Sequence, residues 1–363
     1  MRTKKMKFLF TPAKKIFFVC VILLFFILLA FFVVRGERYG MEQPYAEREI
    51  TFPVMGTVAY LKIQGERGVK KEKLYEVLLQ MQQEIRALEK ECNIYDPCTP
   101  LSLLNKNAAH SPVSVSGHLW KLLEISRKYH QFSGGAFDIS ITPLMKVWGF
   151  YRKRNLLPKE EEIRESRKFV GLEKILFDDV EKKVRFPSPG FHLDLGGIAK
   201  GYALDLARKV AEKNGVYRGV LDLGGNIVTL SLPFHGRLFY RIGIKDPGNK
   251  EKLLAVIRMP PGKAIATSGS YERFRKIEGK HFSHIIDPLS GYPVSGSLSA
   301  SILTEKGVDS DALSTTLFIR GEGFMEKIAE AFPGTELLYF RWEGKKWKGF
   351  SCGKTFAGVK KVF

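Results

Sequence analysis

Nineteen consecutive residues near the amino terminus, Ile16 to Val34, carry no charge and read IFFVCVILLFFILLAFFVV. As a helix this run would be about 28 Å long, close to the hydrocarbon thickness of a bilayer. Lys and Arg precede it without any acid, and positively charged flanks stay in the cytoplasm. We therefore expect a cytoplasmic basic tail at 1–15, a transmembrane signal-anchor at 16–34, and an extracytoplasmic body.

A cleaved secretory signal is the alternative for this segment. Such signals have a shorter apolar region and a small-residue cleavage site, whereas RGERYG follows Val34. Membrane anchoring is therefore favoured, and secretion after cleavage stays the alternative. Either version places the body outside the cytoplasm, where no nucleic-acid partner is expected.

The net charge is strongly positive, with 58 Lys and Arg against 38 Asp and Glu, a formal +20. Residues 1–40 contribute +7 of this, which leaves +13 for the rest. A basic body suits anionic lipid or a phosphate-bearing substrate. Hydrophobic residues make up 45% of the chain, enough for a folded core. The polar stretch 35–50 is predicted to be a linker, 51–350 one domain, and 351–363 a basic tail.

Hydrophobic periodicity predicts an amphipathic helix over 70–91 and a second helix over 117–132. The charged run 157–167 is most simply a solvated helix face. Strands and helices are interspersed without a regular alternation, which favours an α+β fold over a doubly wound sheet. The predicted strands cover 57–64, 174–187 as a hairpin, 218–231, 238–245, 253–258 and 299–304.

The segment Asp194–Gly201 (DLGGIAKG) has the composition of a phosphate-binding turn. We expect a strand to end at His192 and Leu193, and a helix to follow the glycines. Free backbone N–H groups at such a turn, together with Lys200, suit an anion. A tight turn with a solvated lysine is the structural alternative.

Asp311 and Thr315 are four residues apart, so on a helix their oxygens share one face. With a backbone carbonyl from a glycine turn, they would suit Mg²⁺, which prefers oxygen ligands. The alternative for Asp311 is a helix N-cap.

His284 stands in the segment SHIIDP, where a short strand is expected to meet a loop. A histidine there could accept a proton from a hydroxyl near neutral pH. A purely structural histidine is the alternative. Cys92, Cys98 and Cys352 lack a Cys–His setting, and the hydrolase triads are disfavoured.

A series of short motifs, taken together, resembles the ApbE family, the FAD:protein FMN transferases. Each motif is weak alone, but their order and spacing match the family. They are Met55-Gly-Thr57, GGAFDISITPLMKVWGF (134–150), LDLGGIAKGYALD (193–205), LDLGGN (221–226), GIKDP (243–247), ATSGSYERF (266–274), SHIIDPLSGYPV (283–294) and DSDALSTTLFIRG (309–321).

The resemblance implies a T-fold-like α+β body that uses FAD and Mg²⁺ and transfers FMN from FAD to a Thr or Ser hydroxyl of an acceptor protein, releasing AMP. It implies His284 as the base and Lys200 beside the phosphates. The implied metal positions are Gly197 (through its carbonyl), Asp311 and Thr315. The implied flavin-contacting positions are Met55, Tyr95, Ala136, Phe137, Asp138, Asp194, Lys200 and Ile285.

The chain departs from the family pattern at Thr99–Asn105 (TPLSLLN), which puts the contact through Tyr95 in doubt. Two other functions stay open. One is a Mg²⁺-dependent FAD pyrophosphatase with water as acceptor, and the other is a non-catalytic, membrane-tethered flavin-binding protein.

Overall fold

The computed structural model describes residues 45–363, apart from 247–248, 271–273, 345, 358 and 360–363. The predicted tail 1–15 and anchor 16–34 lie outside this part of the chain. Among the described residues, no helix has the length and apolar character needed to cross a membrane.

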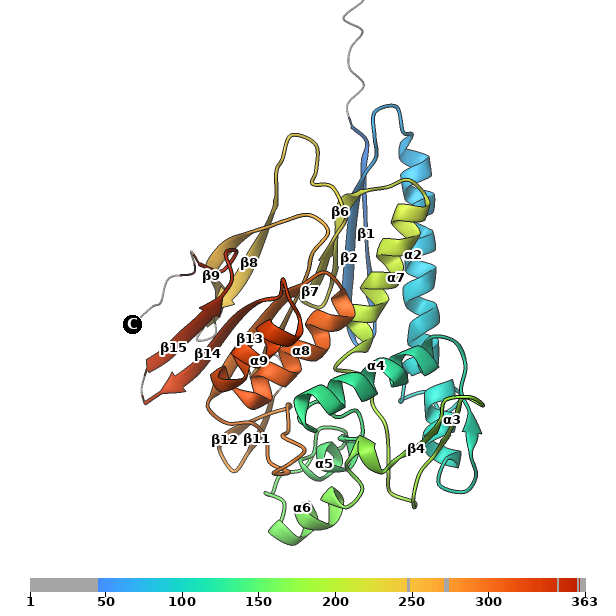
Figure 1. Cartoon of the computed structure of the whole chain (residues 1–363), viewed down its shortest axis with the longest axis vertical. Coiled ribbons are helices and arrows are strands. Elements are labelled where there is room, and N and C mark those ends of the chain that lie inside the picture. Colours follow the sequence, from blue (N-terminus) through green and yellow to red (C-terminus); the bar gives the residue numbers. More distant parts are fainter. Residues whose placement is uncertain (1–44, 247–248, 271–273, 345, 358, 360–363) are drawn as a thin grey trace, which may run out of the picture. The chain divides into compact units, whose positions relative to one another are not determined.

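Eight antiparallel strands make up the central sheet, in the order β1-β2-β6-β7-β10-β13-β14-β15 (Figure 1). The strands of this sheet are β1 (Glu47–Val54), β2 (Thr57–Gln64), β6 (Arg218–Leu223), β7 (Asn226–Thr229), β10 (Ala264–Gly269), β13 (Ser297–Thr304), β14 (Glu336–Glu343) and β15 (Lys346–Cys352). The smaller sheets pair β3 (Val113–Ser114) with β5 (Lys183–Arg185) and β4 (Leu176–Asp178), β8 (Tyr240–Asp246) with β9 (Asn249–Met259), and β11 (Phe274–Ile277) with β12 (Lys280–Ser283).

Helices α2 (Lys71–Cys92), α7 (Ala199–Lys213) and α8 (Gly307–Arg320) cover one face of the central sheet (Figure 1). The other helices are α3 (Pro100–Asn107), α4 (Gly117–Ser133), α5 (Thr142–Val147), α6 (Glu160–Arg167) and α9 (Met325–Ala331), with short 3-10 helices η1 (Leu172–Lys174) and η2 (Glu322–Phe324). The α+β expectation is confirmed, as are the helices predicted over 70–91 and 117–132 and the solvated face of α6.

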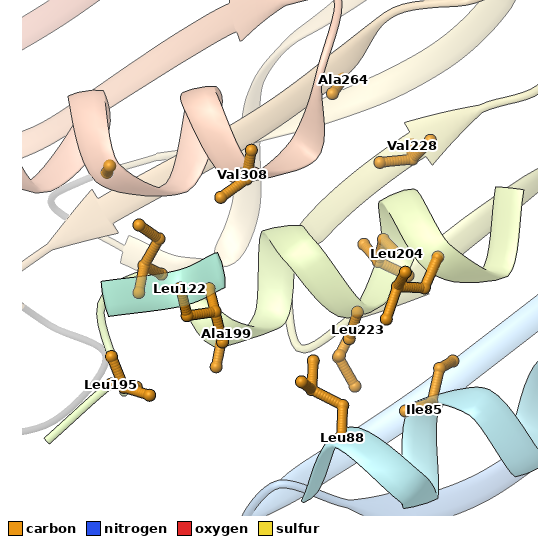
Figure 2. Packing of buried hydrophobic residues seen from close by; sticks show 14 of the residues in the cluster. Ile85, Leu88, Leu122, Leu195, Ala199, Leu204, Leu223, Val228, Ala264 and Val308 are labelled. Atoms are coloured by element: carbon orange, nitrogen blue, oxygen red, sulfur yellow. The ribbon is translucent and has the colours of Figure 1, made fainter. Parts of the chain in front are cut away.

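The main core lies between the sheet and helices α2, α7 and α8. Figure 2 shows Leu88 of α2, Leu204 of α7 and Val308 of α8 in this cluster. On the other face, β8 and β9 cover a second apolar cluster that includes Leu338 and Phe340 of β14. Packing on both faces fixes the register of the central strands, because a one-residue slip would move every side chain to the opposite face.

The chain enters the fold earlier than the sequence predicted. The expected linker 35–50 is wrong at its end, because β1 starts at Glu47 and pairs with β2 along its whole length. Only Phe52 and Val54 of β1 are buried. An edge strand with polar outward side chains resembles a linker in composition, which explains the error.

The expected basic tail 351–363 is also wrong in its first residues. Strand β15 continues to Cys352, and the side chain of Phe356 is fully buried in the second cluster. A single aromatic residue among lysines and glycines carries no periodicity, so no sequence pattern predicts that Phe356 is buried.

The predicted strand 218–231 is a hairpin, because β6 and β7 turn at Gly224 and Gly225, both at positive φ. The strand expected at His192 and Leu193 is absent. Instead, the amide side chain of Asn105 bonds both the N–H and the carbonyl of Leu193, at 2.7 and 2.9 Å.

Candidate active site

Helices α7 and α8 approach so closely that only glycine fits between them. A Cβ on Gly201 would lie 2.1 Å from the Gly307 carbonyl oxygen. This approach lets the Asp311 carboxylate accept a hydrogen bond from the Gly201 N–H at 3.0 Å. The glycines in the predicted phosphate turn therefore serve helix packing as well as backbone access.

Lys200 interacts with both the glycine-rich turn and Asp311 of α8. Its Nζ lies 3.6 Å from Asp311 Oδ1 and donates to the Gly196 carbonyl at 3.2 Å. Asp311 is only 4% exposed, so its carboxylate is largely withdrawn from water. It sits inside α8 rather than at its start, and the N-cap alternative is wrong. The structure thus brings Lys200 and Asp311 together as the sequence predicted.

Thr315 lies one turn further along α8 and faces Gly197. A Cβ on Gly197 would come within 3.8 Å of Thr315 Oγ1 and 3.5 Å of the Phe137 ring. The Thr315 hydroxyl also hydrogen-bonds Ser268 Oγ of β10, at 3.3 Å. Ser268, which the sequence did not single out as a site residue, therefore orients the hydroxyl.

The residues predicted to hold a metal would all bind it through oxygen atoms. These are the carboxylate of Asp311, the hydroxyl of Thr315 and the backbone carbonyl of Gly197. Gly197 leaves space beside Thr315 Oγ1 that a larger side chain would fill. Hard oxygen donors with room for further ligands match the preference of Mg²⁺. The residues present therefore fit this ion.

Asp205 is a structural residue of the same region that sequence reasoning missed. Its carboxylate accepts hydrogen bonds from the N–H groups of Gly307 and Val308, at 2.8 and 2.9 Å, and so caps α8. Burial raises the pKa of Asp205 above its ordinary value. Asp205 belongs to α7 but caps α8, and no local sequence motif predicts a cap from another helix.

Tyr151 is a second missed residue, and it lies at the predicted flavin face. Its hydroxyl donates to the Asp194 carboxylate, and its ring lies 6.1 Å from that of Tyr95. Burial, and then the charge of Asp194, raise the pKa of Tyr151. Tyr95 is 74% exposed. The structure therefore groups Tyr95, Tyr151 and Asp194, although the pattern around Tyr95 departs from the family.

The loop that contains Ala136, Phe137 and Asp138 is fixed from within. The Asp138 carboxylate accepts hydrogen bonds from Ser140 N–H and Oγ and from Leu172 N–H, and burial raises its pKa. The Asp138 side chain therefore stabilises the loop, and its neighbours Ala136 and Phe137 are the residues of this loop that could contact a ligand. Phe137 reaches toward Gly197, while Ala136 is buried in the loop.

His130 braces the same loop from α4. Its Nδ1 lies 3.4 Å from Asp138 Oδ2, and its Nε2 lies 2.9 Å from Glu173 Oε2. The three side chains place ligand-type atoms within 4.8 Å of one another. Because Asp138 already accepts bonds from the loop backbone, we assign this cluster a structural role.

Met55 occupies the turn between β1 and β2. It has a positive φ of 50°, which is rare for a residue other than glycine, and its N–H donates to Glu89 of α2. The turn at Gly224 lies beside it, because Gly224 N–H donates to the Val58 carbonyl. Two of the sequence motifs are therefore adjacent turns at one edge of the site region.

His284 directly follows β12 and begins the loop 284–294. The loop is joined to the 134–150 region by a hydrogen bond from Trp148 Nε1 to the Gly291 carbonyl, and Leu289 lies 3.4 Å from where a Cβ of Gly135 would be. Ile285 is buried in the main core. The structure thus places His284 in a loop that packs against the segment carrying Phe137.

His192 lies close enough to Lys146 and Asp194 for both charges to affect its pKa. Burial, and then the charge of Lys146, lower the pKa of His192 from 6.5 to about 4. Its Nδ1 is buried, with no hydrogen-bond partner among the described residues. His192 is therefore neutral at physiological pH.

A cavity of about 1050 Å³ lies elsewhere, between α9 and β15. Its lining includes Met325, Trp347 and Phe350, and none of the predicted site residues. Cavity size therefore does not define the candidate site, which rests on the chemistry of its residues.

Comparison with known proteins agrees with this fold. The profile of the ApbE family matches residues 55–339. A FAD:protein FMN transferase of Treponema pallidum is 31% identical over 304 residues, covering 79% of this chain and 82% of that protein. The Vibrio cholerae enzyme of the same name is 28% identical over 301 residues, covering 80% and 87%.

Solved structures are similar over most of their length. The ApbE protein of Thermotoga maritima has 29% identity and a TM-score of 0.72, covering 81% of this chain and 94% of that one. Flavin transferase ApbE from Vibrio cholerae has 25% identity and a TM-score of 0.75, covering 85% and 97%. The fold and these relatives define a transferase enzyme. The chain belongs to the ApbE family.

Proposed function

We propose that this protein is a Mg²⁺-dependent FAD:protein FMN transferase that modifies a Thr or Ser hydroxyl of an extracytoplasmic acceptor protein and releases AMP. The observation that carries the proposal is the convergence of Lys200, Asp311, Thr315 and Gly197 between α7 and α8. The relatives carry the same activity in their names.

The metal would be held by Asp311, Thr315 and the Gly197 carbonyl. When bound, it would neutralise charge on the transferring phosphoryl group. Lys200 adds a second positive charge at the same place, where Asp311 holds its ammonium group. Tyr95, Tyr151 and Asp194 would meet the flavin, with Phe137 between them and the phosphates.

His284 would accept the proton of the acceptor hydroxyl. The acceptor oxygen forms a bond to the phosphorus of the FMN half, and the pyrophosphate oxygen leaves with AMP. A base is needed because a neutral alcohol is a weak nucleophile. The position of His284 on a partly exposed loop is consistent with access by a protein substrate.

Hydrolysis of FAD by the same site is the second candidate, because the same groups would activate water. The deciding experiment incubates the full chain, in detergent, with FAD, Mg²⁺ and a Thr-bearing acceptor, and measures the mass of the acceptor and of the free products. FMN on the acceptor with AMP in solution supports transfer. Free FMN and AMP with an unmodified acceptor would show that the protein is a pyrophosphatase. Unchanged FAD would indicate a non-catalytic flavin-binding protein.

We also propose that residues 16–34 anchor the protein in the membrane with residues 1–15 in the cytoplasm. The support is the uncharged run and its basic flank. Protease added outside intact cells or protoplasts should then remove the body. Full protection of the body contradicts this topology, and a secreted form beginning near residue 36 supports cleavage instead.

A further inference from the structure

The hairpin of β11 and β12 stands apart from the central sheet. Among the described residues its two strands pair only with each other, and they turn at Glu278 and Gly279, both at positive φ. Strand β12 leads directly into His284. The hairpin is therefore joined in sequence to the proposed base, and it is open to further strand pairing.

One face of the hairpin is packed and the other is exposed. Ile277 is 1% exposed, and the Phe282 ring lies 5.2 Å from that of Trp148. On the opposite face, Phe274 stacks on His281 with ring centroids 4.7 Å apart, and Phe274 is 44% exposed. The packed face holds the hairpin in place, and the exposed face offers an aromatic surface.

Among the residues that the structure describes, the outer edge of β12 has no backbone partner. In a hairpin with a two-residue turn, the closing pair Ile277 and Lys280 exchanges hydrogen bonds, and alternate pairs do the same. The backbone groups of His281 and Ser283 therefore point away from β11. His281 is exposed, whereas Ser283 is buried, so an extended peptide could bond the backbone of His281 as a third strand.

The charge of the hairpin favours an acidic peptide. The hairpin has three basic residues, Arg275, Lys276 and Lys280, and one acidic residue, Glu278. The Glu278 carboxylate also accepts a hydrogen bond from Leu157 N–H. Lys276 and Lys280 are exposed. An acidic segment would be attracted, and a basic one repelled.

We propose that β12 binds an acidic, extended segment of the acceptor protein as a third strand and so presents its hydroxyl to His284. An added strand lies about 4.8 Å from β12, and directly opposed side chains are about 5 Å apart. A Thr or Ser opposite the end of β12 would then lie next to His284. This inference rests on the proposed function and names its partner surface.

The test uses a synthetic peptide of about ten residues, the length of a long strand, with one Thr flanked by several Asp residues. A second peptide has Lys in place of Asp, and a third has the acidic sequence with its backbone nitrogens methylated. Binding to the full chain in detergent, with FAD and Mg²⁺, is measured by fluorescence anisotropy. We expect only the unmethylated acidic peptide to bind, because methylation removes the donors of a strand.

The hairpin variant Lys276→Glu/Lys280→Glu should weaken binding of the acidic peptide about tenfold, because two attractions become repulsions. The matched control Lys70→Glu/Lys71→Glu reverses two charges at the amino-terminal end of α2 and should bind like the wild type. Equal binding by the hairpin variant and the control, no binding to the wild type, or equal binding of the methylated peptide would overturn the inference.

Transfer is measured separately, by the mass of the peptide. If the acidic peptide binds the hairpin but never gains FMN, the docking inference holds and the proposed function fails. If the peptide gains FMN equally with wild type and hairpin variant, the proposed function holds and the docking inference fails.

Discussion

The two sides of the proposed reaction are built in opposite ways. The donor side, formed by Lys200, Asp311 and Thr315, lies between two helices in contact, with Asp311 only 4% exposed. The acceptor side, formed by the β11–β12 hairpin and His284, has one packed face and one exposed aromatic face, with Phe274 44% exposed. Groups that stabilise charge gain strength when water is excluded, whereas a surface for a protein partner must stay accessible.

The largest expected effect tests the acceptor side. His284→Asn should lower FMN transfer by about 10²- to 10⁴-fold, the usual contribution of a positioned general base. FAD affinity should change little, because the phosphate contacts assigned above lie on other residues. Covalent flavin on the acceptor, seen on a denaturing gel under ultraviolet light, and FAD affinity by fluorescence give the two readouts.

The control for this variant is His110→Asn, at an exposed histidine of a distant loop. Undiminished labelling by His284→Asn would remove this residue from the mechanism. Loss of both FAD binding and labelling would instead make it a structural or flavin-contacting histidine.

On the donor side, Asp311→Asn separates charge from packing. The amide oxygen can still accept the Gly201 N–H, so the unfolding temperature should hardly move. Loss of the negative charge should lower FAD turnover by about 10²- to 10³-fold, as for removal of one stabilising group in an active site. Turnover that survives both this change and EDTA would contradict the metal assignment.

Gly201→Ala tests whether the helix contact itself sustains the donor side. Its Cβ would lie 2.1 Å from the Gly307 carbonyl oxygen, so α7 and α8 must separate. We expect a loss of about 3 kcal/mol in the free energy of unfolding, measured with urea. Gly323→Ala is the matched control, because a Cβ there meets no atom within 4 Å. Equal stability of the two variants would show that the helices adapt.

The sequence predicted the donor side better than its supports. Asp311 and Thr315 were predicted from their local helical spacing together with the family resemblance, and Lys200 from its place in a glycine-rich segment. Asp205 and Tyr151 were missed, since their partners Gly307 and Asp194 lie far away in sequence or carry no periodic signal. Likewise, β1 is an edge strand with mostly exposed side chains, and Phe356 is buried against residues far away in sequence, neither of which composition reports.

The smallest expected effect concerns His192, which lies close to Asp194. Its pKa is lowered from 6.5 to about 4, by burial and then by Lys146. Between these values the unfolded chain binds a proton that the folded chain does not. The stabilising contribution of neutral His192 is therefore complete above pH 6.5 and is lost as the pH falls toward 4.

Since His192 is partly exposed, solvent screening limits this loss to about 2 kcal/mol or less. The variant His192→Phe keeps a ring of similar shape and removes the titration, and Nδ1 has no hydrogen-bond partner to lose among the described residues. Urea unfolding at pH 7 and pH 5 should show a larger drop for the wild type than for the variant. Equal losses of stability in the two proteins would mean that the imidazole of His192 is solvated in the folded protein, so that burial does not lower its pKa.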